Sequence, residues 1–454
     1  MGEERIVIIG GNAAGMTAAS RAKRLSPSLA ITILESGPRI AYSICGLPYF
    51  LSGLVPDLGR LELFTPESLM NERGIEARVG SRGVEIQPSQ RKVVVEEVET
   101  GERKTLGYDK LLVATGYRPV KPSIEGLDRE GVFTASRLGD AEAIAAWLSA
   151  KTARRGVLVG GGYVGLEIAE ALVGRGLEVT LVEAAPRVLS SSIDPDMGEL
   201  VESELTRRGV RVMTGRRVKR ICGNADGEVE AVELEAGSLR IPADLVFVDV
   251  GVAPAVELAV SSGVELGPSG GIAVNDRLET NLPGVFAAGN CAETWNLVSE
   301  RPEIALVGTV AAKQGRVAGE NLAGRHSRFR GMVGTGLVKV FDVSVARTGL
   351  SLAQAEAAGF RVVHSRVEGR FQADYFGDAK ASVKVVADRD SGRLLGAQIV
   401  GAAEGALRVD VAAAALTAKL TVEEASQLDL AYAPHAGALW NPLLVALNTL
   451  MREL

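Results

Sequence analysis

Short apolar runs alternate with amphipathic stretches along the first half of the chain. Residues 6–10 read IVIIG, and residues 11–25, GNAAGMTAASRAKRL, follow with apolar positions at helical spacing. The same order returns at residues 156–176, GVLVGGGYVGLEIAEALVGRG, and a second apolar run ending in an acidic residue comes next. Two strand–turn–helix–strand units, about 150 residues apart, predict two related nucleotide-binding domains with parallel sheets.

Antiparallel pairing is predicted elsewhere in the chain. Residues 91–116 alternate apolar and polar positions around Thr100-Gly101, which predicts a hairpin leading into a buried strand, and residues 228–251 predict a comparable hairpin. A further change of pattern comes near residue 326, after an Ala-rich helical stretch. The remainder predicts an α+β domain with an antiparallel sheet. The expected fold is therefore α/β, with two Rossmann-like domains, the first discontinuous, and an α+β C-terminal domain.

Composition narrows the functional classes. At 454 residues the length suits about three domains of ~150 residues each. Hydrophobic residues at 46% and charged residues at 23% exclude a disordered chain. The net charge of −6 gives no basic footprint, so nucleic acid and anionic membranes are not expected partners. Small molecules are the expected partners.

Cysteine usage bears on the compartment. The three cysteines, Cys45, Cys222 and Cys291, have no CxxC spacing, which argues against a disulfide framework or a metal site and favours a reducing compartment. The N-terminus enters a strand directly, without a signal sequence, and no window approaches ~18 uninterrupted apolar residues. We expect a cytoplasmic protein.

The first glycine-rich turn predicts a phosphate cradle. Gly10 and Gly15 stand at the first and third positions of the dinucleotide motif, and Asn12 takes the middle one. Glu35 follows Gly10 by 25 residues, at the end of the next strand, where an acid accepts hydrogen bonds from a ribose. A turn that is merely structural, with Asn12 as a residue tolerant of the left-handed conformation, is the alternative.

The second turn is a complete G-x-G-x-x-G. Gly160, Gly162 and Gly165 form it, and Glu183 lies 23 residues after Gly160. A carboxylate there pairs with a free ribose 2′-hydroxyl and repels a 2′-phosphate, so NADH is expected to be favoured over NADPH. Arg187, four residues after Glu183, could weaken that preference if its side chain turned toward the ribose. A solvated surface charge is the simpler interpretation of this residue.

Cys45 is a candidate reactive thiol. It lies in residues 41–53, AYSICGLPYFLSG, with Phe50 five residues later in place of a second cysteine. A helix beginning here would lower the pKa of the thiol through its N-terminal amides. The alternative is a buried structural cysteine.

The whole chain resembles the single-cysteine branch of the FAD-dependent pyridine nucleotide-disulfide oxidoreductases, which includes CoA-disulfide reductases, persulfide reductases, NADH oxidases and NADH peroxidases. The motifs that carry the resemblance are GGNAAGMTAASRAKRL, SICGLPYF, LLVATGYRP, VGGGYVGLEIAE, TNLPGVFAAGNCAE and DLAYAP. The resemblance implies FAD on residues 1–121 and 253–325, NADH on 122–252, and dimerisation through 326–454. It also implies that Cys45 faces the flavin and forms a mixed disulfide, or a sulfenic acid in the peroxide branch, while Cys222 and Cys291 have no redox role.

The resemblance also assigns cofactor-binding positions. Asn290 replaces an aspartate that usually binds the flavin, and because an amide can donate or accept, FAD binding is still expected. Tyr163 resembles the tyrosine that covers the nicotinamide side of the flavin, and Glu167 the acid nearby. The cofactor-binding set implied is Gly10, Asn12, Ala14, Gly15, Glu35, Ala114, Thr115, Gly116, Gly160, Gly162, Tyr163, Gly165, Glu167, Glu183, Gly289 and Asn290.

Departures from the family pattern affect the expected substrate. Ala13 stands where oxidases and peroxidases carry a histidine, which disfavours the peroxide branch. Ala41 and Ile44 replace a serine and an asparagine that help to hold CoA, and Arg73 replaces a lysine at a CoA phosphate. The CoA-contacting positions implied are Thr17, Arg21, Arg24, Ser43 and Arg73. CoA is thus a possible ligand, with small persulfides as the other candidates.

The C-terminal motif implies a shared site. Tyr375 and Tyr432 resemble two tyrosines that reach the partner subunit's cysteine, so a homodimer is expected. His435 stands where the family has a second proline after YAP. It is either a general acid that protonates a leaving thiolate or a loop histidine bonded to backbone.

The expected activity is NAD(P)H-dependent reduction of CoA disulfide or small persulfides through Cys45 and FAD. Two alternatives stay open: an NADH oxidase or peroxidase that uses a Cys45 sulfenic acid, and an NADH-binding flavoprotein that acts as a redox sensor or scaffold.

Overall fold

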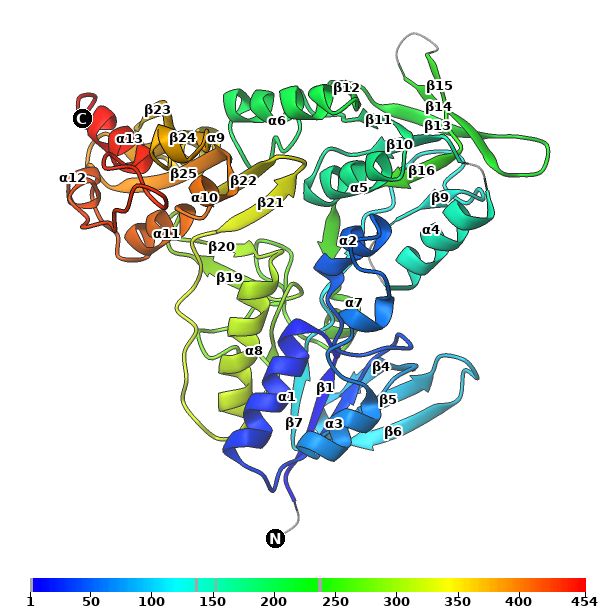
Figure 1. Cartoon of the computed structure of the whole chain (residues 1–454). Helices are drawn as coiled ribbons and strands as arrows, with labels where there is room; N and C mark the ends of the chain where they lie inside the picture. Colours follow the sequence, from blue (N-terminus) through cyan, green and yellow to red (C-terminus); the bar gives the residue numbers. More distant parts are fainter. Residues whose placement is uncertain (1–2, 135–137, 152, 236–238) are drawn as a thin grey trace.

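The computed structural model describes residues 3–134, 138–151, 153–235 and 239–454. Three five-stranded sheets organise it (Figure 1). The first is parallel, in the order β18-β7-β1-β2-β3, and comprises Val285–Ala287, Lys110–Val113, Arg5–Ile9, Ala30–Leu34 and Glu76–Arg78. Its strands β1 and β7 are short runs of Ile, Leu and Val that are buried on both faces, as parallel strands require.

Two helices lie side by side against this sheet (Figure 1). They are α1 (Ala13–Leu25) and α8 (Gly308–Leu322). Cβ atoms at Gly315 and Gly319 would lie 2.3 Å from the Ala14 carbonyl oxygen and 2.4 Å from that of Ala18. Small residues therefore let the two helix backbones touch, which fixes α1 and the turn before it.

Smaller elements surround the first sheet. The hairpin predicted around Thr100-Gly101 is confirmed, as part of a three-stranded antiparallel sheet. The elements are α3 (Pro66–Arg73), β4 (Ser81–Gln87), β5 (Lys92–Glu97), β6 (Arg103–Gly107), β8 (Tyr117–Pro119), β17 (Val252–Pro254), α7 (Glu257–Ser261), β19 (Glu293–Asn296) and β20 (Arg301–Ile304).

The second sheet repeats the first. It is parallel, in the order β12-β11-β10-β16-β9, and comprises Arg211–Met213, Glu178–Val182, Arg155–Val159, Leu245–Val248 and Val132–Phe133. The hairpin expected within residues 228–251 is present as β14 and β15. The remaining elements are α4 (Leu138–Ala150), α5 (Tyr163–Gly174), α6 (Pro195–Arg207), β13 (Val218–Gly223), β14 (Val229–Leu234) and β15 (Arg240–Pro242).

The third sheet is antiparallel, as the sequence predicts. Its order is β21-β22-β25-β24-β23, and it comprises Gly336–Val340, Val343–Gly349, Leu394–Gly401, Lys380–Asp388 and Val362–Arg370. The helices of this region are α9 (Leu352–Ala358), α10 (Ala403–Ala406), α11 (Val409–Thr417), α12 (Val422–Ser426) and α13 (Pro442–Leu450).

A buried ion cluster joins the second and third sheets' regions. The Lys384 ammonium on β24 lies 3.1 Å from the Asp194 carboxylate and 2.7 Å from that of Asp196, at the start of α6. Gln398 on β25 donates to Asp194 at 2.9 Å. Because Lys384 and Asp194 are almost fully buried, each depends on the other for its charge to be tolerated.

One short segment from the region of the first sheet packs against the region of the second sheet. Cys45 lies in a 3-10 turn, η1 (Ile44–Gly46), which leads into α2 (Leu47–Leu51). Leu47 and Leu51 are buried in one apolar cluster with Leu166 and Leu172 of α5, and Figure 1 shows α2 beside α5. The segment that carries Cys45 is thus packed against the helix that opens the second glycine turn.

Among the described residues, no helix has both the length and the apolar character needed to cross a bilayer.

Candidate functional site

The first glycine turn is a cradle that side chains would fill. Gly10 has φ +108°, and a Cβ there would lie 2.1 Å from the Ala114 carbonyl oxygen. A Cβ at Gly15 would lie 1.9 Å from the Gly10 carbonyl oxygen. Asn12 precedes α1 with φ −103°, so the left-handed conformation considered for it is wrong. Only glycine allows the backbone to close this tightly and leave room for a pyrophosphate.

Glu35 is fixed beside this cradle at the end of β2. Its two carboxylate oxygens accept hydrogen bonds from the Gly11 N–H at 3.0 Å and the Gly37 N–H at 2.8 Å. A carboxylate held by backbone amides keeps further lone pairs free for ribose hydroxyls. The residues fit the adenosine part of FAD.

The other residues expected at the flavin follow neighbouring strands of the same sheet. Thr115, after β7, donates to the Ala255 carbonyl at 2.6 Å, and Gly116 has φ +71°. Gly289, after β18, donates its N–H to the buried Gln314 at 2.7 Å, and a Cβ there would lie 2.9 Å from that of Ala14. Because β1, β7 and β18 are parallel, the residues that follow their carboxyl ends lie at the same edge of the sheet as the glycine turn. The half-buried Asn290 is one of these residues.

The second glycine turn repeats the first. Gly160 has φ +113°, and a Cβ there would lie 1.8 Å from the Asp249 carbonyl oxygen. Glu183 accepts hydrogen bonds from the Gly161 and Ala185 N–H groups, both at 2.6 Å. This turn opens into a cavity of about 1060 Å³ lined by Gly160, Gly162, Tyr163, Glu183 and, among others, Tyr117, Arg216, Arg217 and Asp249.

Tyr163 and Glu167 lie one helical turn apart on α5. The Tyr163 hydroxyl is buried and has no hydrogen-bond partner in the described part of the chain. Burial raises the pKa of Glu167 to about 7, and the charge of Glu170 adds to the effect. An unpartnered buried hydroxyl and a carboxyl whose charge is penalised by burial are unfavourable in an isolated chain. They fit a site completed by a polar ring system such as nicotinamide or flavin.

Cys45 is exposed, so the alternative of a buried structural cysteine is wrong. The expected lowering of its pKa is also wrong: partial desolvation by surrounding atoms raises the pKa of the thiol, and the Glu167 charge raises it further. The reason is local, because α2 begins only at Leu47 and has five residues. Such a short helix offers little dipole to the thiolate, and a carboxylate of α5 opposes it.

Two aromatic residues near Cys45 were missed by sequence reasoning. Burial raises the pKa of Tyr117 to about 12, and the Cys45 charge contributes next. Burial and then Glu167 raise the pKa of Tyr49. Tyr117 follows Gly116 inside the ATGYRP motif, so its place in the sequence was available as a signal. Nothing in the sequence identifies Tyr49 except its position in the Cys45 segment, residues 41–53.

The positions expected to hold CoA are only partly brought together. Arg73 donates to the Ser20 hydroxyl of α1, and its guanidinium lies 4.2 Å from the centre of the Phe64 ring. Arg21 is already paired with Glu320 of α8 at 2.6 Å. Arg24 and Ser43 are exposed, and Thr17 is half-buried. A cationic surface therefore exists along α1, with Arg21 engaged by the protein itself.

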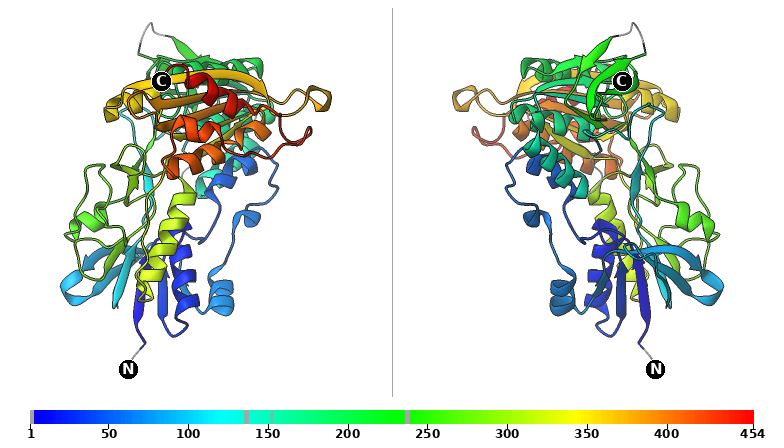
Figure 2. Two further views of the ribbon diagram at one scale, coloured as in Figure 1. Left: turned by 90° about the vertical axis from the view of Figure 1, so that its left-hand side faces the viewer. Right: turned by 90° about the vertical axis from the view of Figure 1, so that its right-hand side faces the viewer.

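The three C-terminal candidates lie on two adjoining loops. The Ala373 N–H donates to the Pro434 carbonyl at 2.8 Å, and the rings of Phe376 and His435 are 6.1 Å apart. Tyr375 is 73% exposed and Tyr432 is 52% exposed. Figure 2 shows both loops projecting from the third sheet's region. They form an open aromatic surface.

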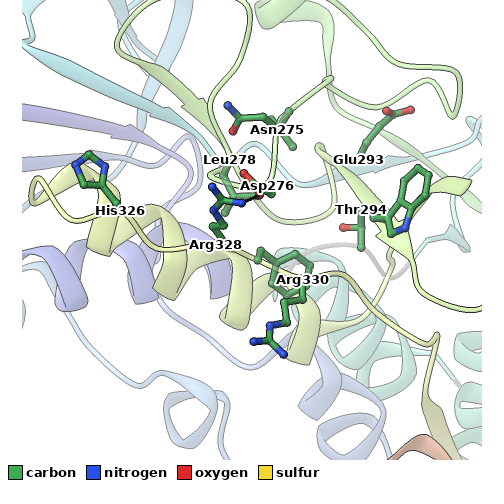
Figure 3. Close-up of a pocket in the computed structure, with 11 residues that line it drawn as sticks. Asn275, Asp276, Leu278, Glu293, Thr294, His326, Arg328 and Arg330 are labelled. Carbon is green, nitrogen blue, oxygen red and sulfur yellow. Dashed lines mark ion pairs between the residues drawn. The ribbon is translucent and has the colours of Figure 1, made fainter. Parts of the chain in front are cut away.

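A second cavity, of about 790 Å³, is lined by other residues, which Figure 3 shows. Residues from 274–278, β19 and 326–330 line it, and none of the site residues expected from the sequence is among them. Its Arg328 pairs with Asp276 at 3.1 Å, and its Glu293 accepts from the Ser269 hydroxyl and N–H. Much of its charge is thus satisfied within the protein.

Comparisons with known proteins agree with this geometry. Residues 4–315 match the pyridine nucleotide-disulphide oxidoreductase family, and residues 336–441 match that family's dimerisation domain. A Pyrococcus abyssi protein named NAD(P)H sulfur oxidoreductase (CoA-dependent) is 36% identical to this chain. The matched part covers 99% of this chain and 98% of that protein. A Methanocaldococcus jannaschii protein named NADH oxidase is 32% identical, over 99% of each chain.

Among solved structures, an NAD-dependent persulfide reductase from A. fulgidus is similar with a TM-score of 0.95 and 36% identity, covering 99% of this chain and 83% of that one. The two glycine cradles, the sheet order and the matched ranges lead to one conclusion. The chain belongs to the pyridine nucleotide-disulphide oxidoreductases and is an oxidoreductase of the kind that uses FAD and NAD(P)H.

Proposed function

We propose that this enzyme uses NAD(P)H to reduce CoA disulfide or small persulfides, with Cys45 as its only redox-active cysteine. The observation that carries the proposal is the exposed Cys45 thiol on a segment packed against α5, which bears Tyr163 and Glu167. Of the other two cysteines, Cys291 is fully buried and Cys222 lies on β13, in a separate three-stranded sheet. Neither of them offers a second thiol for an intramolecular disulfide with Cys45.

Residues 1–121 and 253–325 would hold FAD, and residues 122–252 would hold NAD(P)H. Gly10, Gly15 and Glu35 would bind the FAD pyrophosphate and ribose, and Tyr163 and Glu167 would border the nicotinamide. Bound FAD supplies a two-electron relay from the nicotinamide to a disulfide. The protein's part is to align the two cradles and keep Cys45 reachable from solvent.

Cys45 attacks the substrate disulfide and then carries one half of it as a mixed disulfide. Its thiolate displaces one thiolate from R–S–S–R, forming a Cys45–S–S–R mixed disulfide and releasing RS⁻. Two electrons and one proton then cleave the mixed disulfide, which releases RSH and restores the Cys45 thiolate. With a persulfide R–S–SH, attack of the Cys45 thiolate at the outer sulfur releases RS⁻ and leaves Cys45–S–SH. Two electrons and one proton then reduce Cys45–S–SH, which releases hydrogen sulfide and restores the Cys45 thiolate.

CoA is favoured as the R group by the cationic surface of α1. Arg24 is free of ion pairs with other described residues, and Arg73 is anchored beside α1 through Ser20. Guanidinium groups bind phosphates well. The relative from P. abyssi is named as CoA-dependent, which supports this choice.

The enzyme acts as a homodimer in the cytoplasm. The exposed Tyr375, Tyr432 and His435 would reach the Cys45 region of the partner subunit, where His435 would donate the proton to the leaving thiolate. Exposed aromatic surface of this kind is costly to leave in water.

A second candidate is an oxidase or peroxidase in which peroxide converts Cys45 to a sulfenic acid. The exposure of Cys45 and the relative named NADH oxidase favour it. Ala13 argues against it, because this turn offers no histidine beside the cradle.

The test compares Cys45→Ser with Cys222→Ser. Both should retain yellow flavin, and only Cys45→Ser should lose NADH-dependent reduction of CoA disulfide and persulfide. Intact mass before and after dithiothreitol should show loss of a Cys45-bound thiol, and a loss equal to CoA identifies the partner. Full turnover by Cys45→Ser would remove its assigned role, and faster NADH oxidation with peroxide than with any disulfide would favour the second candidate.

A further inference from the structure

The cavity of about 790 Å³ has an exposed aromatic wall. Trp295 of β19 lines it and is 48% exposed, and the half-buried Phe329 lines it from the segment 326–330. A tryptophan that borders a hollow and stays half exposed offers a flat apolar face to a ring-shaped ligand. The volume lies within the range of about 300–1,000 Å³ that binding sites for small molecules occupy.

Backbone pairing holds a second segment against Trp295. The Met332 N–H donates to the Trp295 carbonyl at 2.9 Å, and the Leu297 N–H donates to the Met332 carbonyl at 2.8 Å. Gly331 has φ +119°, and a Cβ there would lie 2.4 Å from the same Trp295 carbonyl oxygen. The chain around Gly331 therefore runs in backbone contact with β19, and this contact places Arg330 on a wall that adjoins the one formed by Trp295.

One charge in the lining of this cavity lacks a protein partner. Arg328 pairs with Asp276 at 3.1 Å, and Glu293 accepts hydrogen bonds from the Ser269 N–H and hydroxyl. Arg330 is exposed and forms no ion pair or side-chain hydrogen bond with another residue in the part of the chain that the structure describes. Figure 3 shows Arg330 on a different side of the cavity from Glu293. The free charge is thus a cation, which favours an anionic ligand.

The hairpin of β19 and β20 borders both cavities. Its residues Asn296, Arg301 and Glu303 line the 1060 Å³ cavity at the second glycine turn, whereas Trp295 lines the other one. Met332, which is hydrogen-bonded to Trp295, also lines the larger cavity. A ligand that packs on Trp295 would therefore contact a hairpin that also borders the cavity of the second cradle.

We propose that the 790 Å³ cavity binds a nucleoside monophosphate as an effector, with the base on Trp295 and the phosphate on Arg330. Stacking on an aromatic side chain is open to every nucleobase. A guanidinium matches phosphate oxygens in two-point contacts. The cavity is large enough for a base, a sugar and a phosphate together. Through the shared hairpin, occupancy of this site changes the affinity of the second cradle for NADH.

The binding test uses Trp295 as its own reporter. The chain has three tryptophans, so Trp147→Phe/Trp440→Phe leaves Trp295 as the only one. In the FAD-loaded enzyme, with the second cradle saturated by NAD⁺, AMP should quench this fluorescence saturably, and adenosine should bind roughly tenfold more weakly. Adding Arg330→Ala should weaken AMP binding roughly tenfold and change adenosine binding by less than about twofold. Inorganic phosphate alone should not quench.

Arg325→Ala is the matched control. Arg325 is exposed five residues before Arg330 and is not among the residues that line the cavity. The control should bind AMP like its parent. Isothermal titration of the enzyme with native tryptophans, again saturated with NAD⁺, repeats the comparison of Arg330→Ala and Arg325→Ala without the two Phe substitutions. The proposal is overturned if AMP leaves the fluorescence of Trp295 unchanged, or if the two arginine variants bind AMP equally well.

The effector role is tested by flavin reduction, which needs no disulfide. Anaerobic stopped-flow reduction of the bound FAD by NADH, with and without AMP, gives the apparent Kd for NADH. In Arg330→Ala, AMP should act only as a competitor at the second cradle, so the shift in wild type should differ from it by at least about twofold. Equal shifts would remove the effector role. Because this readout precedes any chemistry at Cys45, a failure of the proposed disulfide reduction would leave it unaffected.

Discussion

Two effects raise the pKa of the Cys45 thiol, first its own partial desolvation and then a carboxylate of α5. That carboxylate is Glu167, which adds to the effect of desolvation and has itself a pKa raised to about 7 by burial. The sequence predicts the position of Cys45 through its motif, and the exposed thiol fits a reactive role. It does not predict the pKa of the thiol, because the opposing charge lies 122 residues away and reaches Cys45 only through the packing of α2 on α5.

Glu167→Gln should make Cys45 more reactive. Removing the carboxylate charge lowers the thiol pKa, so the rate of iodoacetamide alkylation of the protein without NADH should rise roughly threefold to tenfold near pH 8. Below pH 7 the difference should shrink, because the pKa of about 7 leaves Glu167 largely neutral there. Alkylation rates followed by mass spectrometry across pH 6–9 provide the measurement.

Glu199→Gln, an exposed position on α6, serves as the control and should leave the alkylation profile unchanged. Stability offers a second readout. Because the folded-state pKa of Glu167 is raised from 4.5 to about 7, its contribution to the unfolding free energy should decline as pH rises through that interval, which the difference between wild type and Glu167→Gln isolates. The Gln variant should lack that decline, and an unchanged slope would contradict the burial of this carboxyl.

At the scale of elements, the glycine turns are the part of the site that sequence predicts best. Gly10 to Gly15 and Gly160 to Gly165 carry their own geometry, because a strand, a turn and a helix are consecutive in the chain. The place of Arg216 beside Glu183 is different, since it depends on which strand pairs with β11. Periodicity predicts that a strand exists but not its neighbour in the sheet.

Gly15→Ala should release FAD without unfolding the first sheet. The added methyl would lie 1.9 Å from the Gly10 carbonyl oxygen, so the turn must open. Overpacking of this kind costs about 1–3 kcal/mol, which corresponds to FAD retention weaker by roughly fivefold to 150-fold. The ratio of flavin absorbance to protein after gel filtration measures the effect.

Gly174→Ala is the matched control for that substitution. Gly174 ends α5, and a Cβ there meets nothing within 4 Å. Alanine in a helix is favoured over glycine by up to about 1 kcal/mol, so this variant should keep its flavin and melt at the same or a higher temperature. Equal flavin loss in both variants would show that general destabilisation, rather than the cradle, is responsible.

At the scale of the whole molecule, the chain leaves an aromatic surface uncovered. Tyr375, Phe376, Tyr432, Leu439 and Trp440 are all more than half exposed on the third sheet's region. That region also matches the family's dimerisation domain. Only the family resemblance predicts that Tyr375 and Tyr432 contact a partner subunit. Their own sequence patterns do not predict such a contact.

Hybrid dimers give the sharpest test of a site shared between subunits. One protomer would carry Cys45→Ser and the other Tyr375→Phe, Tyr432→Phe and His435→Gln, with a different affinity tag on each so that only the hybrid is purified. If the loops act on the partner's Cys45, one of the two sites contains every native group, and the hybrid should show about half of wild-type disulfide turnover. Each parental homodimer should be nearly inactive. Because loops acting within their own protomer would leave both sites defective, an inactive hybrid with normal flavin content and dimer size would place the C-terminal residues in the same subunit as the cysteine they serve.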